Sequence, residues 1–139
     1  MKPIITFLVA LGLVAAAHPA THGANPVAES GPENIIEVRM IDAGGGQWRF
    51  EPASIEAQTG DVVRFIQDDV APHNVEFKNV PAGTHLGAAI MGPFLLRKGQ
   101  TYDVAIDERF APGEHSYVCT PHEPLGMVGH ITVIAEDRR

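Results

Sequence analysis

The run GEHSYVCTPHEPLGMVGHITVIA, residues 113–135, predicts two β-strands joined by one short loop. In its first part, His115, Tyr117 and Cys119 fall on one face of an extended chain. The last part alternates in the same way from Ile131 onward. An alternation with a period of two is typical of half-buried strands. The run therefore predicts a strand pair whose connecting loop holds two prolines.

Upstream of this run the chain shows the same period of two, and no stretch has a convincing helical period. Turn signals such as GGG at 44–46 and PG at 112–113 separate the alternating runs. The expected strands are 35–41, 48–50, 54–57, 62–67, 74–77, 101–106, 113–119 and 128–135. Seven or eight short strands in about 100 residues indicate an all-β protein built as a β-sandwich. The longest irregular stretch is 81–98.

The chain has 139 residues with 17 acidic and 10 basic side chains, so its formal net charge is −7. That length fits one domain and is too short for a multidomain oxidase. The acidic balance argues against nucleic acid as a partner, because a phosphate backbone requires clustered lysine and arginine. The single cysteine, Cys119, excludes an intrachain disulfide, a four-cysteine zinc site and a cysteine-ligated iron–sulfur cluster.

The N-terminus has the arrangement of a secretory signal peptide: a basic residue, an apolar run, and small residues that end at Ala17. The apolar run is shorter than the ~20 residues that a helix needs to cross a bilayer. We expect residues 1–24 to be the signal peptide, cleaved after Ala17 or Ala24, followed by a flexible lead-in at 25–34 and the folded domain at 35–139. The mature protein is then exported, to the periplasm or the extracellular space.

A metal-binding pattern occupies the loop, because Cys119, His122 and Met127 follow one another as Cys-x2-His-x4-Met. A turn between two strands can bring a thiolate, an imidazole and a thioether to one point. A second imidazole, from His73, would have to come from a different loop. Two histidines, one cysteine and a weak axial methionine are the blue-copper donor set, and soft sulfur disfavours magnesium and calcium. An exported lone thiol would also be oxidised unless it is buried or bound.

The stretch 117–129 closely resembles the copper loop of small blue (type 1) copper proteins, the cupredoxins of the plastocyanin and pseudoazurin type. VAPHNV at 70–75 resembles the upstream ligand segment, and PASI at 52–55 with GDVVRF at 60–65 resembles the strands before it. The resemblance implies a Greek-key β-sandwich with one type 1 copper ion that alternates between Cu(I) and Cu(II). The ligands that it implies are His73, Cys119, His122 and Met127, with Asn74 tying the two ligand loops together and its backbone N–H near the cysteine sulfur.

From these features we expect an exported soluble electron carrier and not an enzyme. Redox proteins, for example a cytochrome or a copper reductase, are the expected partners of a monomeric carrier. Val118 stands where photosynthetic plastocyanins have an aromatic electron port, so the expected port is the edge of His122. This edge is expected to be ringed by Pro93, Pro124 and Leu125, with Asp68 and Asp69 forming an acidic fringe.

Two interpretations from other classes remain open. A periplasmic copper carrier or delivery protein would use the same ligands, and reversible electron transfer without metal loss would separate it from an electron carrier. An enzyme would use Cys119 as a nucleophile activated by a histidine. Against the enzyme, a methionine has no use in such a site and the chain has no obvious oxyanion-hole motif.

Overall fold

The computed structural model describes residues 34–135. The expected signal peptide and all but the last residue of the expected lead-in lie outside the described residues, so they stay predictions. In the part of the chain that is described, no helix is long and apolar enough to cross a membrane.

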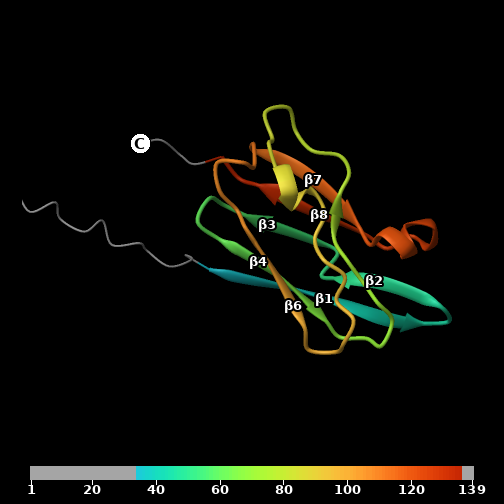
Figure 1. Cartoon of the computed structure of the whole chain (residues 1–139). Coiled ribbons are helices and arrows are strands. Elements are labelled where there is room, and N and C mark those ends of the chain that lie inside the picture. The colour runs from blue at the N-terminus through green and yellow to red at the C-terminus, as the bar shows by residue number, and fades with distance from the viewer. Residues whose placement is uncertain (1–33, 136–139) are drawn as a thin grey trace, which may run out of the picture.

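Eight strands form two four-stranded sheets that face each other (Figure 1). The first sheet has the order β2-β1-β4-β6 and consists of β1 (Ile35–Gly44), β2 (Gln47–Glu51), β4 (Val62–Gln67) and β6 (Thr101–Ala105). The second has the order β3-β8-β7-β5 and consists of β3 (Ser54–Ala57), β5 (Glu76–Phe77), β7 (Gly113–Val118) and β8 (Val128–Val133). Two 3-10 helices, η1 (Gly87–Ile90) and η2 (Thr120–Leu125), lie in the connections. The expected all-β sandwich is confirmed.

Each sheet combines antiparallel and parallel pairs. The β1–β2 hairpin and the β4–β6, β5–β7 and β7–β8 pairs are antiparallel, whereas β1 with β4 and β3 with β8 are parallel. A parallel pair cannot be closed by a tight turn, so the chain crosses from one sheet to the other between its members. These crossings give the sandwich its two layers.

The core lies between the sheets and is built from the inward residues of each alternation. In β4, Val63, Phe65 and Gln67 are buried while the residues between them are partly exposed. Phe50 of β2 and Tyr117 of β7 are both fully buried, and their ring centroids lie 4.8 Å apart at an angle of 75°. Edge-to-face contacts of this kind add to the free energy of apolar burial. They join one sheet to the other beneath the loops that follow β4 and β7.

The structure differs from the sequence prediction in one strand and two connections. The strand expected at 74–77 is shortened to β5, because the backbone before β5 pairs with another segment: the Val75 carbonyl accepts from the N–H of Gly92 (2.8 Å), and His73 pairs with Leu95 through hydrogen bonds of 3.2 and 2.7 Å. The long irregular segment contains η1. The loop after Cys119, expected as a turn, forms η2.

Candidate metal centre

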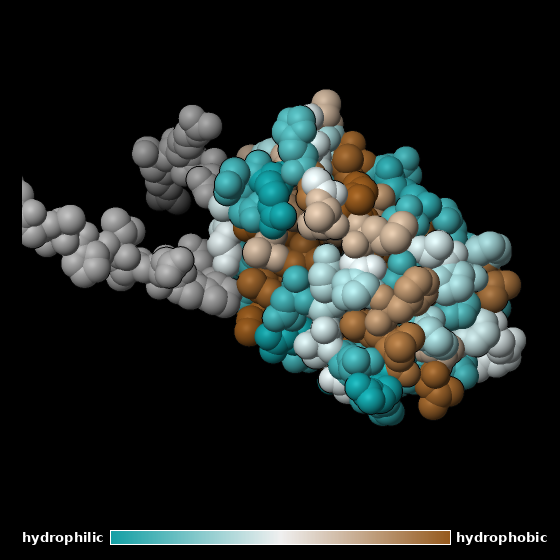
Figure 2. Space-filling model, in the orientation of Figure 1, coloured by the Kyte–Doolittle hydropathy of each residue, from teal (hydrophilic) through white to brown (hydrophobic). Residues whose placement is uncertain are grey.

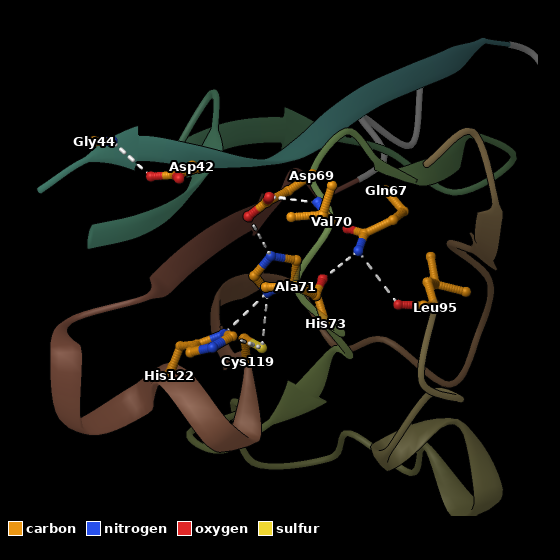
Figure 3. A network of polar contacts seen from close by, with 10 residues as sticks. All are labelled: Asp42, Gly44, Gln67, Asp69, Val70, Ala71, His73, Leu95, Cys119 and His122. Carbon is orange, nitrogen blue, oxygen red and sulfur yellow. Dashed lines mark hydrogen bonds and ion pairs between the residues drawn. The ribbon is translucent and has the colours of Figure 1, made fainter. Parts of the chain in front are cut away.

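Three donor atoms from two separate segments converge at one end of the sandwich (Figure 3). Cys119 directly follows β7, His122 lies in η2, and His73 lies in the connection between β4 and β5. The Sγ of Cys119 is 3.4 Å from the Nδ1 of His73 and 3.4 Å from the Nδ1 of His122. The two Nδ1 atoms are 3.0 Å apart. The structure therefore brings together three of the four side chains that the sequence predicts as ligands.

The spacing of these three atoms fits a metal ion at their centre. A point equidistant from them lies about 1.9 Å from each, close to the ~2.0–2.3 Å bonds that zinc, a neighbouring first-row metal, makes to nitrogen and sulfur. One sulfur and two imidazole nitrogens are donors that suit copper. Among residues 34–135, these are the histidine, cysteine or acidic side chains that come together in a group of three, with all donor atoms within 4.8 Å of one another.

Burial determines the protonation of the three side chains. It lowers the pKa of His73 and the pKa of His122, so both rings are neutral at neutral pH and each keeps a nitrogen lone pair. Burial raises the pKa of the Cys119 thiol, against the opposite effect of backbone N–H groups of Asn74 and His122. A buried thiol with a raised pKa is a weak nucleophile. A metal ion bound to the sulfur would displace its proton, because the thiolate is the ligand form.

Backbone hydrogen bonds shape the loop that carries His122. The N–H of Cys119 donates to the carbonyl of Met127 (3.2 Å), and the N–H of Met127 donates to the carbonyl of His122 (3.1 Å). Gly126, which ends η2, has a φ of 86°, a left-handed conformation that strains other residues. The loop thus folds back on itself and places Met127, the fourth predicted ligand, fully buried beside the backbone of Cys119.

Asn74 joins the segment of His73 to the segment of Cys119. Its Oδ1 accepts a hydrogen bond from the backbone N–H of Thr120 (2.8 Å), and its Nδ2 donates to the Thr120 hydroxyl (2.9 Å). Asn74 is almost completely buried, so its end of these bonds is shielded from water, whereas Thr120 is exposed. The two loops that supply the donors are therefore held in one arrangement.

Trp48 of β2 is a neighbour of the site that the sequence analysis did not identify. Its ring stacks on the ring of His122, with centroids 4.2 Å apart and planes inclined by 22°. The one signal in the sequence is that Trp48 shares a face of β2 with Phe50, so it must cover some part of the interior. The strand pattern does not show which residues Trp48 covers, because its contact with His122 depends on how β2 and η2 come together.

Asp69 does not belong to an exposed acidic fringe, so this part of the prediction is wrong. Asp69 is 7% exposed, and its Oδ2 lies 3.3 Å from the Nε2 of His73. Asp68 is nearer the surface, where it pairs with Arg39 and Lys98. Both acidic residues stand in an irregular segment after β4, where neighbouring side chains have no fixed alternation and one can turn inward.

The remaining described histidines lie outside the donor cluster. His115 is buried in β7, with its Nε2 3.1 Å from the Thr84 hydroxyl and its Nδ1 3.1 Å from the Gly113 carbonyl. Tyr117 packs in the aromatic core and Val118 is buried, so neither offers an aromatic surface beside the cluster.

A family model described as copper binding proteins, plastocyanin/azurin family, matches residues 37–134. Plastocyanin from Prochlorothrix hollandica is 40% identical over 84 residues, which cover 60% of this chain and 62% of that protein. Chloroplastic plastocyanin from Chlamydomonas reinhardtii is 34% identical over 95 residues, or 67% of this chain and 63% of that protein. The chain therefore spans less than two thirds of the length of these two relatives.

Solved structures of plastocyanin and pseudoazurin are also similar to this chain. The oxidized form of plastocyanin from Dryopteris crassirhizoma matches with a TM-score of 0.57 and 30% identity, over 70% of this chain and 98% of the fern protein. Pseudoazurin from Methylobacterium extorquens matches with a TM-score of 0.53 and 27% identity, over 75% of this chain and 78% of that protein.

Proposed function

This chain belongs to the plastocyanin/azurin family of copper-binding proteins, and we propose that it carries single electrons through one type 1 copper ion. The observation that supports this most is the convergence of His73, Cys119 and His122 around one point. In the proposed site these three residues would supply the strong ligands, and Met127 would supply a weak thioether ligand. When bound, copper would supply the redox chemistry, which is the gain and loss of one electron, and the chain would supply the ligands and the docking surface.

The contribution of the protein is a donor arrangement that need not rearrange when the electron arrives. His73 and Cys119 are fully buried, so their side chains have little freedom to move. His122 is partly exposed, but its ring is restrained by the stacked ring of Trp48. The Asn74–Thr120 bonds link the two loops. A site of this kind supports fast electron transfer more readily than release of the metal.

This arrangement favours the electron carrier over the two alternatives. The enzyme interpretation needs an accessible and acidic thiol, whereas Cys119 is 0% exposed and burial raises its pKa. The copper-delivery interpretation needs ligands that leave easily, whereas His73 and Cys119 are enclosed by the sandwich. Repeated oxidation and reduction with no loss of copper to a chelator would support the carrier, and release of copper on each reduction would support delivery.

Titration of the purified, copper-free protein with Cu(II) tests the proposal. We expect one equivalent to produce an intense visible absorption band and a type 1 EPR spectrum, and voltammetry to show a reversible one-electron wave. Binding without the intense band would mean that the thiolate is not a ligand, and an irreversible wave would contradict a carrier.

Met127→Gln should keep copper and lower the reduction potential, because a harder oxygen donor at the axial position favours Cu(II) over Cu(I). We expect a fall of at least about 59 mV, which corresponds to a tenfold change in a one-electron equilibrium. Met91→Gln is the matched control, since the side chain of Met91 is 49% exposed to solvent whereas that of Met127 is fully buried. Voltammetry of both variants decides the matter: equal potentials would exclude Met127 as the axial ligand.

We propose that electrons enter and leave through the edge of His122, the one donor of the cluster that is not fully buried. Its neighbour Leu125 is 53% exposed, and Pro93 and Pro124 are also exposed. Hydrophobic residues form patches among hydrophilic ones on the face shown in Figure 2. Exposed apolar patches bordered by polar residues mark protein interaction sites, so this rim is the surface at which a redox partner would dock.

Leu125→Glu should slow electron self-exchange between two copies of the protein by on the order of tenfold, because each encounter would then bring like charges together at the port. Ile134→Glu adds the same charge at the other end of β8, about 20 Å away for a strand of this length. Line broadening in NMR spectra of mixed Cu(I) and Cu(II) samples measures the rate. Equal rates in the two variants would place the port elsewhere.

The proposal includes export and a redox partner of the class of a cytochrome or a copper reductase. The signal pattern in residues 1–24 supports export. Mass spectrometry of the protein secreted by a bacterial host should find a chain that begins at His18 or Asn25. An uncleaved chain in the cytoplasm would contradict this part of the proposal.

A further inference from the structure

A buried carboxylate lies directly behind one of the proposed ligands (Figure 3). Asp69 is 7% exposed, and its Oδ2 lies 3.3 Å from the Nε2 of His73. The other nitrogen of the same ring, Nδ1, faces the sulfur of Cys119 and the ring of His122. The His73 ring therefore stands between the carboxylate and the donor cluster.

Among the described residues, no lysine or arginine side chain balances the charge of Asp69. Among residues 34–135, the basic side chain within 4.0 Å of its carboxylate is that of His73, whose ring is neutral, and no lysine or arginine reaches it. Asp68 differs in this respect, because it pairs with Lys98 at 2.9 Å and with Arg39 at 3.0 Å. A buried carboxylate that lacks a cation is costly in free energy. A positively charged ion on the far side of the His73 ring would offset part of that cost.

The carboxylate is also held in place and ionised. Its Oδ1 accepts a hydrogen bond from the backbone N–H of Val70. Burial acts to raise the pKa of Asp69, but hydrogen bonds from Val70, His73 and Ala71 together lower it below its ordinary value. The side-chain amide of Gln67 donates to the carbonyl of Ala71, which secures the same segment from within the core. These hydrogen-bond donors stabilise the ionised form of the Asp69 carboxyl group and hold its segment in place.

We propose that Asp69 is a positioning residue that holds the proton of His73 on Nε2 and lowers the reduction potential of the copper site. The inference rests on the proposed function, because it requires His73 to be a copper ligand. When Nε2–H donates to the carboxylate, the lone pair of Nδ1 points toward the cluster, and the ring becomes a stronger donor.

The direction of the effect follows from the charges. Cu(II) with the thiolate of Cys119 has a net charge of plus one, and Asp69 brings the total to zero. Cu(I) with the thiolate is neutral, and Asp69 makes the total minus one. A buried site of low polarity favours the neutral state over the charged one. Asp69 therefore stabilises the oxidised site relative to the reduced site.

Asp69→Asn tests the proposal because the amide oxygen can still accept from Nε2–H while the charge is removed. We expect the reduction potential to rise by the equivalent of at least a tenfold change in the Cu(II)/Cu(I) preference, about 59 mV for one electron. Asp68→Asn is the matched control, since it removes the same charge from a position that solvent and two basic side chains screen. The Asp68→Asn control should change the Cu(II)/Cu(I) preference less than twofold.

Equal shifts in the two variants, or a lower potential in Asp69→Asn, would overturn the inference. If the unaltered protein lacks the intense visible band or the reversible wave, the proposed function fails. If it has both and Asp69→Asn keeps the same potential, only the inference fails. Asp69→Glu keeps the charge and should stay nearer to the unaltered protein than Asp69→Asn does.

A measurement on the unaltered protein tests the positioning even if Asp69→Asn does not fold. In nitrogen-15 NMR spectra of the Cu(I) protein, the Nε2–H of His73 should exchange slowly with water and resonate downfield, as expected for a hydrogen bond to a carboxylate. A rapidly exchanging Nε2–H, or a proton on Nδ1, would overturn the inference.

Discussion

Cys119→Ser should abolish the intense visible band of the copper-loaded protein completely. The band arises when an electron moves from the thiolate to Cu(II), and a serine oxygen does not supply that transition at visible energies. The sulfur of Cys119 lies 3.4 Å from both histidine Nδ1 atoms, so the change removes one corner of the donor triangle. Absorption and EPR spectra after addition of one equivalent of Cu(II) measure the result.

The fold should survive this substitution, since serine and cysteine have nearly the same size and Cys119 directly follows β7, so no strand pairing is lost. Circular dichroism should show an unchanged β-sheet spectrum. His130→Gln, which alters a histidine of β8 outside the donor cluster, should keep the full band. A strong visible band in Cys119→Ser would show that this sulfur does not bind copper.

Phe50→Ala should lower the free energy of unfolding by ~3–5 kcal/mol, the usual cost of removing a buried aromatic ring. Phe50 is 0% exposed and meets Phe65 and Tyr117 edge to face, with centroids 6.1 and 4.8 Å away. Its loss would leave a cavity between the two sheets. Unfolding in urea measures the change, and the melting temperature should fall by more than about 10 °C.

The consequence for the site follows from the position of Phe50 on β2. Phe50 and Trp48 lie on the same face of this strand, so a loosened β2 should also weaken the stack on His122. Phe94→Ala is the matched control because Phe94 is 48% exposed, and it should change stability by less than ~0.5 kcal/mol. Equal stabilities of the two variants would mean that Phe50 does not support the core.

Much of the fold could be predicted from the sequence because strand patterns are local. The expected strands at 54–57 and 62–67 agree with β3 and β4 residue for residue, since alternation and flanking turn residues mark both ends. The expected strand at 74–77 is too long by two residues. The reason is tertiary, because the backbone just before β5 pairs with the 92–95 segment, Val75 with Gly92 and His73 with Leu95.

The candidate site was predictable in part for the same reason. Cys119, His122 and Met127 lie within one short run, and their donor types and spacing alone indicate soft-metal chemistry. His73 lies far upstream, and its inclusion depended on the resemblance to a family. The structure now brings its Nδ1 within 3.4 Å of the Cys119 sulfur.

The sequence by itself determined the strands, the all-β class and the chemistry of the donor loop, because each depends on residues close together in the chain. Only the tertiary structure decided the surroundings of the two histidines: Trp48 on the ring of His122, and Asp69 on the Nε2 of His73. The Trp48 contact joins elements that are distant in sequence, and the Asp69 contact depends on an irregular segment. No alternation or spacing rule encodes such contacts: the first follows from the way β2 and η2 meet, and the second from the irregular backbone between β4 and β5.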